Sequence, residues 1–214
     1  MKSSIRSEIV RIGKIMYEKN MVNALEGNIS VKDGERIYIT PASVCKGYLE
    51  EEMIVIVNEN GEVIEGTYKP TSEMRVHLAC YKLRPDISSV IHSHSPYATA
   101  YAIANKPIKS SAYPEMIIIF DQIPVLAYGT PSTDEVHAEL SKYIDKVDVF
   151  LLSRHGILSV GSDLNDAFFK IEAAESIAKT LSIANSLGGE AALPESEIDL
   201  LYQMRKKKLG KERI

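Results

Sequence analysis

A chain of 214 residues with 45% hydrophobic residues, 25% charged residues and a net charge of −4 has the composition of an ordinary globular protein that can bury a core. The charge balance argues against a nucleic-acid-binding surface. The first six residues lack the apolar core that is typical of a signal peptide, and no run approaches the roughly 20 apolar residues that a membrane span needs. We therefore expect a single domain over residues 1–214, located in the cytoplasm and binding neither nucleic acid nor membranes.

The first third of the sequence predicts a helix followed by two hairpins. Apolar residues at intervals of three and four indicate an amphipathic helix over residues 4–19. An Asp-Gly pair at residues 33–34 and an Asn-Gly pair at residues 60–61 are typical hairpin turns, which favour antiparallel pairing of the flanking strands. The loop over residues 40–43 consists of small residues, so it could present hydroxyl and backbone N–H groups to a ligand.

A second helix is expected to begin at residues 70–73, which read Pro-Thr-Ser-Glu. Thr71 or Ser72 is the expected N-cap, with Glu73 in the first turn, where the helix dipole favours a carboxylate. The exposed N–H groups of this helix start, beside two hydroxyls, would also suit a phosphate. Glu73 therefore has two interpretations: it stabilises the helix end, or it belongs to a functional site.

Three histidines and Glu73 form a candidate metal site. On the strand predicted to end at His94, the side chains of His92 and His94 project from one face, about 7 Å apart at their Cα atoms. His155 follows an apolar run that is typical of a buried strand. Three imidazoles and one displaceable carboxylate suit zinc, so we predict one Zn²⁺ per chain. The alternative is that these histidines bind no metal, because an isolated His-x-His motif often occurs by chance.

The other histidines and the two cysteines have simpler interpretations. His77 lies four residues after Glu73 on the same helix face; it could support the site, but a packed helix residue is the simpler reading. His137 is expected to face solvent. Cys45 and Cys80 have neither redox nor zinc-thiolate spacing, so we expect buried or unreactive thiols, with Cys45 close enough to the site residues to line a pocket.

The rest of the chain predicts helices alternating with strands. Helices are expected over residues 96–102, 132–144, 163–187 and 195–209. Strands are expected over residues 86–94, 123–127, 147–152 and 156–160. A capping box at Ser132 opens the second of these helices. The basic run at residues 205–208 is expected to end the last helix in solvent, where cations complement the helix dipole, and residues 205–214 could form a flexible tail.

Together these motifs resemble the class II aldolase/adducin family over nearly the whole chain. The residues that carry the resemblance are Gly27-Asn28-Ile29-Ser30, Thr40-Pro41, Pro70-Thr71-Ser72-Glu73, His92-Ser93-His94 and Arg154-His155-Gly156. The resemblance implies an α/β fold: a single three-layer α/β/α domain around a largely antiparallel central sheet. It also implies a homotetramer with active sites at the subunit interfaces.

Matched position by position, the resemblance implies a role for each site residue. The zinc ligands would be Glu73, His92, His94 and His155. The phosphate-binding residues would be Asn28, Ser43, Thr71 and Ser72. Glu73 would leave the metal and act as acid and base when substrate binds. Tyr113 would protonate the aldehyde oxygen from across a subunit interface, unless it is an ordinary packed aromatic before Pro114.

The implied activity is zinc-dependent, reversible cleavage of a ketose 1-phosphate, such as L-fuculose 1-phosphate or a related deoxy-ketose 1-phosphate, to dihydroxyacetone phosphate and a short aldehyde. Cobalt or manganese could replace zinc. Alternatives within the family are a methylthioribulose-1-phosphate dehydratase and a pentulose-5-phosphate 4-epimerase, although epimerases carry aspartate at the position of Glu73. A non-catalytic, adducin-like interaction domain is disfavoured because all four metal ligands are present. The loop over residues 40–43 departs from the family's usual Thr-Pro-Ser-Gly, which leaves the aldehyde open.

Overall fold

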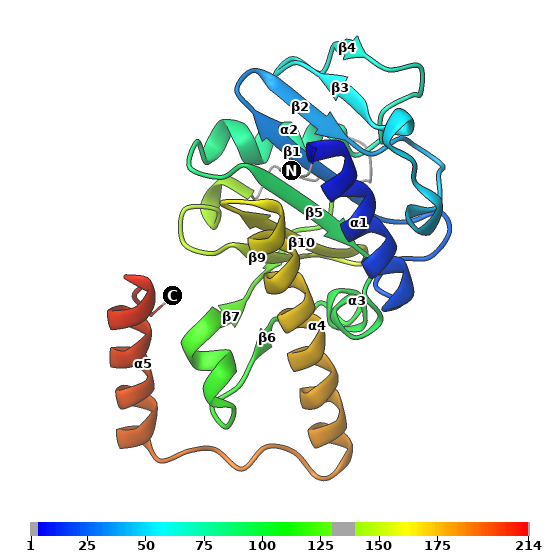
Figure 1. Cartoon of the computed structure of the whole chain (residues 1–214). Coiled ribbons are helices and arrows are strands. Elements are labelled where there is room, and N and C mark those ends of the chain that lie inside the picture. Colours follow the sequence, from blue (N-terminus) through cyan, green and yellow to red (C-terminus); the bar gives the residue numbers. More distant parts are fainter. Residues whose placement is uncertain (1–3, 130–139, 214) are drawn as a thin grey trace.

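The computed structural model describes residues 4–129 and 140–213, and places a large sheet between layers of helices (Figure 1). Within these residues the main sheet has eight strands in the order β4-β3-β2-β1-β5-β10-β9-β8, and β6 and β7 form a separate small sheet. Neighbouring strands of the main sheet run antiparallel, except for the parallel pair of β8 and β9. The predicted α/β architecture around a largely antiparallel sheet is therefore confirmed.

The elements follow the chain in nearly the predicted order. The strands are β1 (Asn28–Asp33), β2 (Arg36–Ile39), β3 (Val55–Val57), β4 (Val63–Glu65), β5 (Ser89–Ser93), β6 (Ile108–Lys109), β7 (Gln122–Ile123), β8 (Val125–Leu126), β9 (Val149–Leu152) and β10 (Gly156–Gly161). The helices are α1 (Ile5–Glu18), α2 (Met74–Leu83), α3 (Pro96–Ile103), α4 (Leu164–Ser186) and α5 (Glu195–Leu209). None of these helices has the length and apolarity that crossing a lipid bilayer requires.

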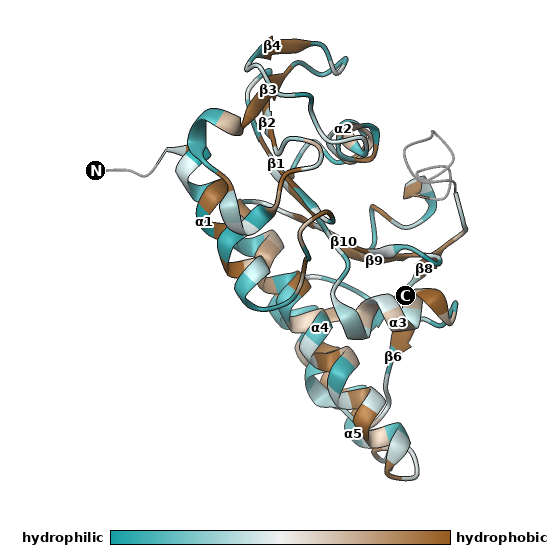
Figure 2. Ribbon diagram, turned by 90° about the vertical axis from the view of Figure 1, so that its right-hand side faces the viewer, coloured by the Kyte–Doolittle hydropathy of each residue, from teal (hydrophilic) through white to brown (hydrophobic). Residues whose placement is uncertain are grey.

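Alternate residues of the central strands face opposite helical layers, as the pleat of a sheet requires. Ile91 of β5 and Ile157 of β10 are buried in the core shared with α1, α3 and α4, whereas Val90 and Leu158 are buried in the core shared with α2. Figure 2 shows the sheet edge-on between these two layers. Strands β5 and β10 thus lie in the middle of both cores, which gives rigid support to the residues at their ends.

The start of α2 differs from the prediction. The helix begins at Met74 with Glu73 as its N-cap residue, and no side chain makes a capping hydrogen bond, so the expected cap by Thr71 or Ser72 was wrong. The Oγ1 of Thr71 still accepts a hydrogen bond of 3.4 Å from the backbone N–H of Glu73. The carboxylate of Glu73 instead points to the histidines described below, because tertiary contacts outweigh a local cap.

The C-terminal segment also differs from expectation. The side chain of Arg205 is 1% exposed and donates hydrogen bonds to the backbone carbonyls of Ile118 and Ile119, so α5 is anchored on the π-helical turn Met116–Phe120. The expectation that the basic run ends the helix in solvent was therefore wrong for Arg205. The expected helix start at Ser132, and His137, lie outside the described residues.

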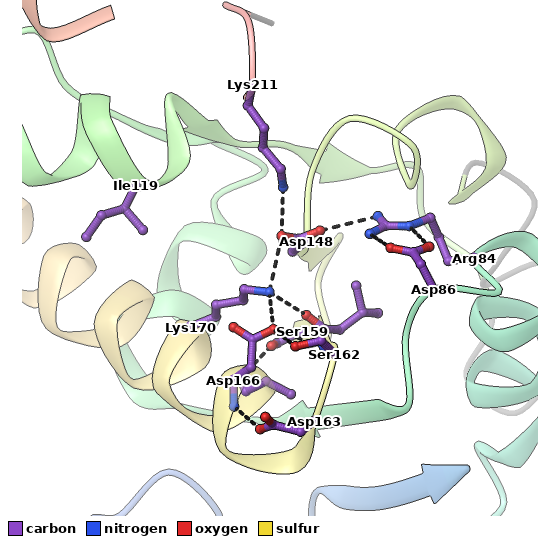
Figure 3. A network of polar contacts seen from close by, with 12 residues as sticks. Arg84, Asp86, Ile119, Asp148, Ser159, Ser162, Asp163, Asp166, Lys170 and Lys211 are labelled. Carbon is purple, nitrogen blue, oxygen red and sulfur yellow. Dashed lines mark hydrogen bonds and ion pairs between the residues drawn. The ribbon is translucent and has the colours of Figure 1, made fainter. Parts of the chain in front are cut away.

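Asp148, just before β9, ties three parts of the fold together (Figure 3). Its carboxylate lies 3.3 Å from the Nη1 of Arg84 at the end of α2, 3.2 Å from the Nζ of Lys170 on α4 and 2.7 Å from the Nζ of Lys211 after α5. Burial alone would raise the pKa of Asp148, but Lys170 and Lys211 outweigh this effect and hold the pKa below its ordinary value. The network links both helical layers to the sheet.

Candidate metal centre

Strand register brings the candidate ligands to one end of the sheet. His92 on β5 lies opposite Asn28 on β1 and opposite Leu158 on β10. His94 follows directly after β5. His155 lies in the turn between β9 and β10, where Arg154 adopts a left-handed conformation with φ of +59°. The turn therefore returns His155 to the strand end that carries His92.

The three histidines form a compact group. Each offers one ligand nitrogen, and these atoms all lie within 4.8 Å of one another. The Nε2 atoms of His92 and His94 are 2.9 Å apart. The Nδ1 of His92 donates a hydrogen bond of 3.0 Å to the carbonyl oxygen of Ile157, so in the neutral ring Nε2 keeps its lone pair for the centre of the group. Such hydrogen bonds fix the tautomer that a metal ligand needs.

Burial keeps the imidazoles of His92 and His155 in the form that binds metal. It lowers the pKa of His92 to about 3, because a charged imidazolium is poorly solvated in the interior, and it also lowers the pKa of His155. Both rings are therefore neutral near pH 7, and neutral imidazole nitrogen is a good zinc ligand. A cation at this position would also offset the electrostatic cost of the buried Glu73 carboxylate.

Glu73 completes the group. Its Oε1 lies 3.2 Å from the Nε2 of His155, and its Oε2 lies 3.4 Å from the Nε2 of His92. Burial would raise the pKa of Glu73, but the neighbouring His92 and His155 and a hydrogen bond of 2.6 Å from the amide of Asn28 outweigh burial and lower the pKa to about 2. The structure thus gathers the four predicted ligands, and their donor set of three nitrogens and one carboxylate fits Zn²⁺.

A buried chain of hydrogen bonds continues from Glu73 into the core beneath α2. Asn28 donates to Glu73, so its Oδ1 is left to accept the hydrogen bond from the Nε2 of His77. The Nδ1 of His77 lies 2.7 Å from the hydroxyl of Ser30, which lies 2.7 Å from the hydroxyl of Tyr81. Burial lowers the pKa of His77 to about 4, so its ring carries one proton and every donor in the chain points toward Glu73. His77 is thus both a packed helix residue and a support for the site.

A polar cavity of about 250 Å³ opens beside the histidines and Glu73. The predicted phosphate-binding residues all line it, namely Asn28, Ser43, Thr71 and Ser72. Lys46, which sequence reasoning did not single out, lines it as well. Tyr113 is not part of the cavity wall in the single chain and packs, half-buried, against the core shared with α1, α3 and α4. Its predicted role across a subunit interface stays a prediction.

Comparison with known proteins identifies the family to which the fold and sequence of this chain are similar. The family model described as "Class II Aldolase and Adducin N-terminal domain" matches residues 7–182. The L-fuculose phosphate aldolase of Methanococcus maripaludis is 35% identical over 85% of this chain and 98% of its own length. The 5-deoxy-D-ribulose 1-phosphate aldolase of Bacillus thuringiensis is 33% identical over 92% of each chain. A solved L-fuculose 1-phosphate aldolase superposes with a TM-score of 0.86 at 32% identity, covering 98% of this chain and 99% of that one.

Proposed function

Because this chain belongs to the class II aldolase and adducin family, we propose that it is a zinc-dependent aldolase that reversibly cleaves a ketose 1-phosphate to dihydroxyacetone phosphate and a short aldehyde. The ketose would be L-fuculose 1-phosphate or a related deoxy-ketose 1-phosphate, in line with the names of two relatives. The observation that carries the proposal is the convergence of Glu73 and three histidines beside a cavity lined by hydroxyl groups.

The metal would be held by His92, His94 and His155, with Glu73 as a displaceable fourth ligand. When bound, Zn²⁺ would supply Lewis-acid polarisation of the substrate's oxygen atoms. The hydroxyls of Thr71 and Ser72, at the start of α2, would position the substrate's phosphate. This anchoring would hold the reacting carbons near Glu73, which is the next residue in the sequence.

Glu73 would move the proton at carbon. In the aldol direction its carboxylate takes a proton from the carbon next to the ketone, and the electron pair left on that carbon forms the new bond to the aldehyde carbon. The aldehyde oxygen then receives a proton from the phenol of Tyr113 of a neighbouring copy of the chain. Cleavage is the reverse. The hydrogen bond from Asn28 supports this role, because it keeps Glu73 ionised and oriented.

The decisive experiment measures release of dihydroxyacetone phosphate in a coupled assay. L-fuculose 1-phosphate, 5-deoxyribulose 1-phosphate and methylthioribulose 1-phosphate would each be tested with and without a chelator. Glu73→Gln would be compared with Glu18→Gln, which alters an exposed carboxylate at the end of α1. We expect the chelator to abolish release of dihydroxyacetone phosphate. Glu73→Gln should reduce the rate of release steeply, whereas Glu18→Gln should leave it unchanged.

Failure of this assay would redirect the assignment. If the protein binds zinc stoichiometrically but releases dihydroxyacetone phosphate from none of the three ketoses, the aldolase proposal is wrong, and dehydration or epimerisation of a pentulose phosphate becomes the assignment to test. A purified protein that takes up no metal would instead support a non-catalytic interaction domain. The preferred ketose would identify the physiological aldehyde.

We propose that residues 1–214 form a single domain, because helices on both faces pack against one sheet. A homotetramer with sites between subunits and a cytoplasmic location stay predictions. Sedimentation velocity would test the first of these: a monomeric protein that is fully active would contradict the proposed contribution of Tyr113 from a second copy.

A further inference from the structure

Lys46 is a buried lysine on the wall of the candidate active site. Its side chain is 2% exposed, which makes it one of the two largest fully buried side chains among the described residues. It lines the same cavity as Ser43, Thr71 and Ser72. We propose that Lys46 supplies the positive charge that binds the substrate's phosphate, so that this cavity selects a phosphorylated ketose over the unphosphorylated sugar. The inference rests on the proposed function and names a residue for it.

The hydrogen bonds of Lys46 leave room for an anion. A lysine ammonium has three N–H donors. The Nζ of Lys46 donates one hydrogen bond of 2.7 Å to the carbonyl oxygen of Val44, and within residues 4–129 and 140–213 no carboxylate lies within ion-pair distance of it. A buried charge without a counter-charge is costly, and a phosphate would provide the missing partner.

Nearby charges favour the same conclusion. Burial is the largest effect and lowers the pKa of Lys46 below its ordinary value, while the carboxylate of Glu73 partly opposes this effect. Glu73 therefore lies close enough to influence Lys46 without forming an ion pair with it. A doubly charged phosphate in the cavity would favour the ammonium form further, since an opposite charge within a few ångströms stabilises the ionised group.

The backbone around Lys46 is held in place by close packing on α1. Lys46 begins the short 3₁₀ helix Lys46–Tyr48. A Cβ atom at Gly13 of α1 would come within 3.0 Å of the carbonyl oxygen of Lys46, and a Cβ atom at Gly47 would come within 2.4 Å of the ring of Tyr17. Both glycines thus permit a contact that a larger residue would block. The lysine is part of a fixed wall and not a mobile surface side chain.

The rest of the cavity wall complements this charge. Thr71 and Ser72 precede α2, whose first N–H groups carry partial positive charge. Hydroxyl donors, helix dipole and ammonium together match the oxygens of a phosphate dianion. Glu26 and Glu73 also line the cavity and would repel an anion, so the phosphate is expected among Ser43, Lys46 and the two hydroxyls, away from those carboxylates.

The test compares Lys46→Met, which keeps the length of the side chain and removes the charge, with Lys14→Met, which removes an exposed lysine of α1. Both are prepared with zinc, and metal content is measured. Isothermal titration gives the dissociation constant of dihydroxyacetone phosphate, and a thermal-shift assay gives the stabilisation by inorganic phosphate. Because a hydrogen bond to a charged group contributes about 1.5 to 3 kcal/mol, Lys46→Met should weaken binding about 10- to 150-fold, with unchanged zinc content.

The stability of the unliganded variants separates a binding role from a structural one. Removing a buried charge that lacks a partner should leave the Tm of Lys46→Met unchanged or raise it, while the Tm increase caused by phosphate is lost. A lower Tm with unchanged affinity would show a structural role and overturn the proposal. If the methionine variant does not fold, Lys46→Gln, which keeps a donor for Val44, gives the same comparison.

The outcomes also distinguish this inference from the proposed function. If the wild-type protein cleaves a ketose 1-phosphate and both Lys46 variants bind dihydroxyacetone phosphate as tightly as it does, only the role of Lys46 is refuted. If the wild-type protein binds neither dihydroxyacetone phosphate nor inorganic phosphate, both proposals fail together. Weaker binding in the Lys46 variants, with Lys14→Met equal to wild type, supports both.

Discussion

Replacing His77 tests whether the buried hydrogen-bond chain behind Glu73 serves the reaction. His77→Leu keeps an apolar side chain in the core beneath α2 but removes two hydrogen bonds. The Oδ1 of Asn28 loses its donor, and the hydroxyl of Ser30 loses its acceptor. The amide of Asn28 is then free to turn, so the donor to Glu73 is no longer fixed. His77→Gln can still donate to Asn28 and should retain most of the function.

The magnitude follows from the burial of these groups. Ser30 and His77 have no exposed surface and Asn28 is 3% exposed, so water cannot replace the lost partners. Each unsatisfied buried group costs about 1 to 3 kcal/mol, which predicts a destabilisation by His77→Leu of roughly 2 to 6 kcal/mol. Loss of the charge-assisted hydrogen bond to Glu73, worth about 1.5 to 3 kcal/mol, predicts that kcat/KM falls about 10- to 150-fold.

The assay measures kcat/KM against pH on folded, zinc-loaded protein, with urea unfolding in parallel. Because the hydrogen bond from Asn28 helps to lower the pKa of Glu73, its loss should shift the acidic limb of the profile to higher pH. Tyr81→Phe is the matched control: it removes a hydroxyl at the far end of the chain and should cost about 1 kcal/mol of stability without changing the rate. A folded His77→Leu variant with wild-type activity and pH profile would show that the hydrogen bonds behind Glu73 do not serve the reaction.

Three further outcomes are expected. Removing zinc should lower the Tm as well as the activity, because a ligand present at 100 times its Kd stabilises the folded chain by about 2.7 kcal/mol. An unchanged Tm in calorimetry would show that the site does not hold the metal. Gly156→Ala places a Cβ atom 2.5 Å from the carbonyl oxygen of Ser93 and 3.0 Å from the rings of His92 and His94, so these rings must shift. We therefore expect metal analysis of the folded variant to show less than one zinc ion per chain. Full zinc occupancy would contradict this expectation. Since the pKa of Asp148 is lowered in the folded state, its contribution to stability is complete above its unfolded pKa of about 3.9 and is lost as the pH falls through the lower folded value. Asp148→Asn should therefore flatten the decline of Tm below about pH 4, whereas identical slopes for wild type and variant would exclude this role.

Strands, hairpin turns and the positions of the candidate histidines could be predicted from the sequence, because these features depend on local patterns. Two-residue alternation predicted that His92 and His94 lie close together, which the structure shows although β5 ends at Ser93, and an apolar run identified the strand before His155. Turn residues identified both hairpins. These predictions succeeded because each depends on residues within a few positions of one another, where backbone geometry is set by local sterics.

Features that depend on packing between distant segments were missed. Lys46 looks like an ordinary surface lysine in sequence, but its side chain is buried and α1 packs closely on its backbone at Gly13. The contact of Asn28 with Glu73 joins the start of β1 to the start of α2, 45 positions away in the chain, which local patterns do not determine. Arg205 is buried for the same kind of reason, since its partners are carbonyls more than 80 positions away in the chain.

The central pairing of β1, β5 and β10 also has a consequence for folding kinetics. Asn28 and Glu73 are 45 positions apart in the chain, and His92 and Ile157 are 65 positions apart. Contacts of such long range make a chain fold slowly, because loop-closure entropy is lost before the contacts form. No short segment holds the ligand set, so a zinc-sensitive signal in refolding experiments is expected to develop only in the phase that joins these three strands.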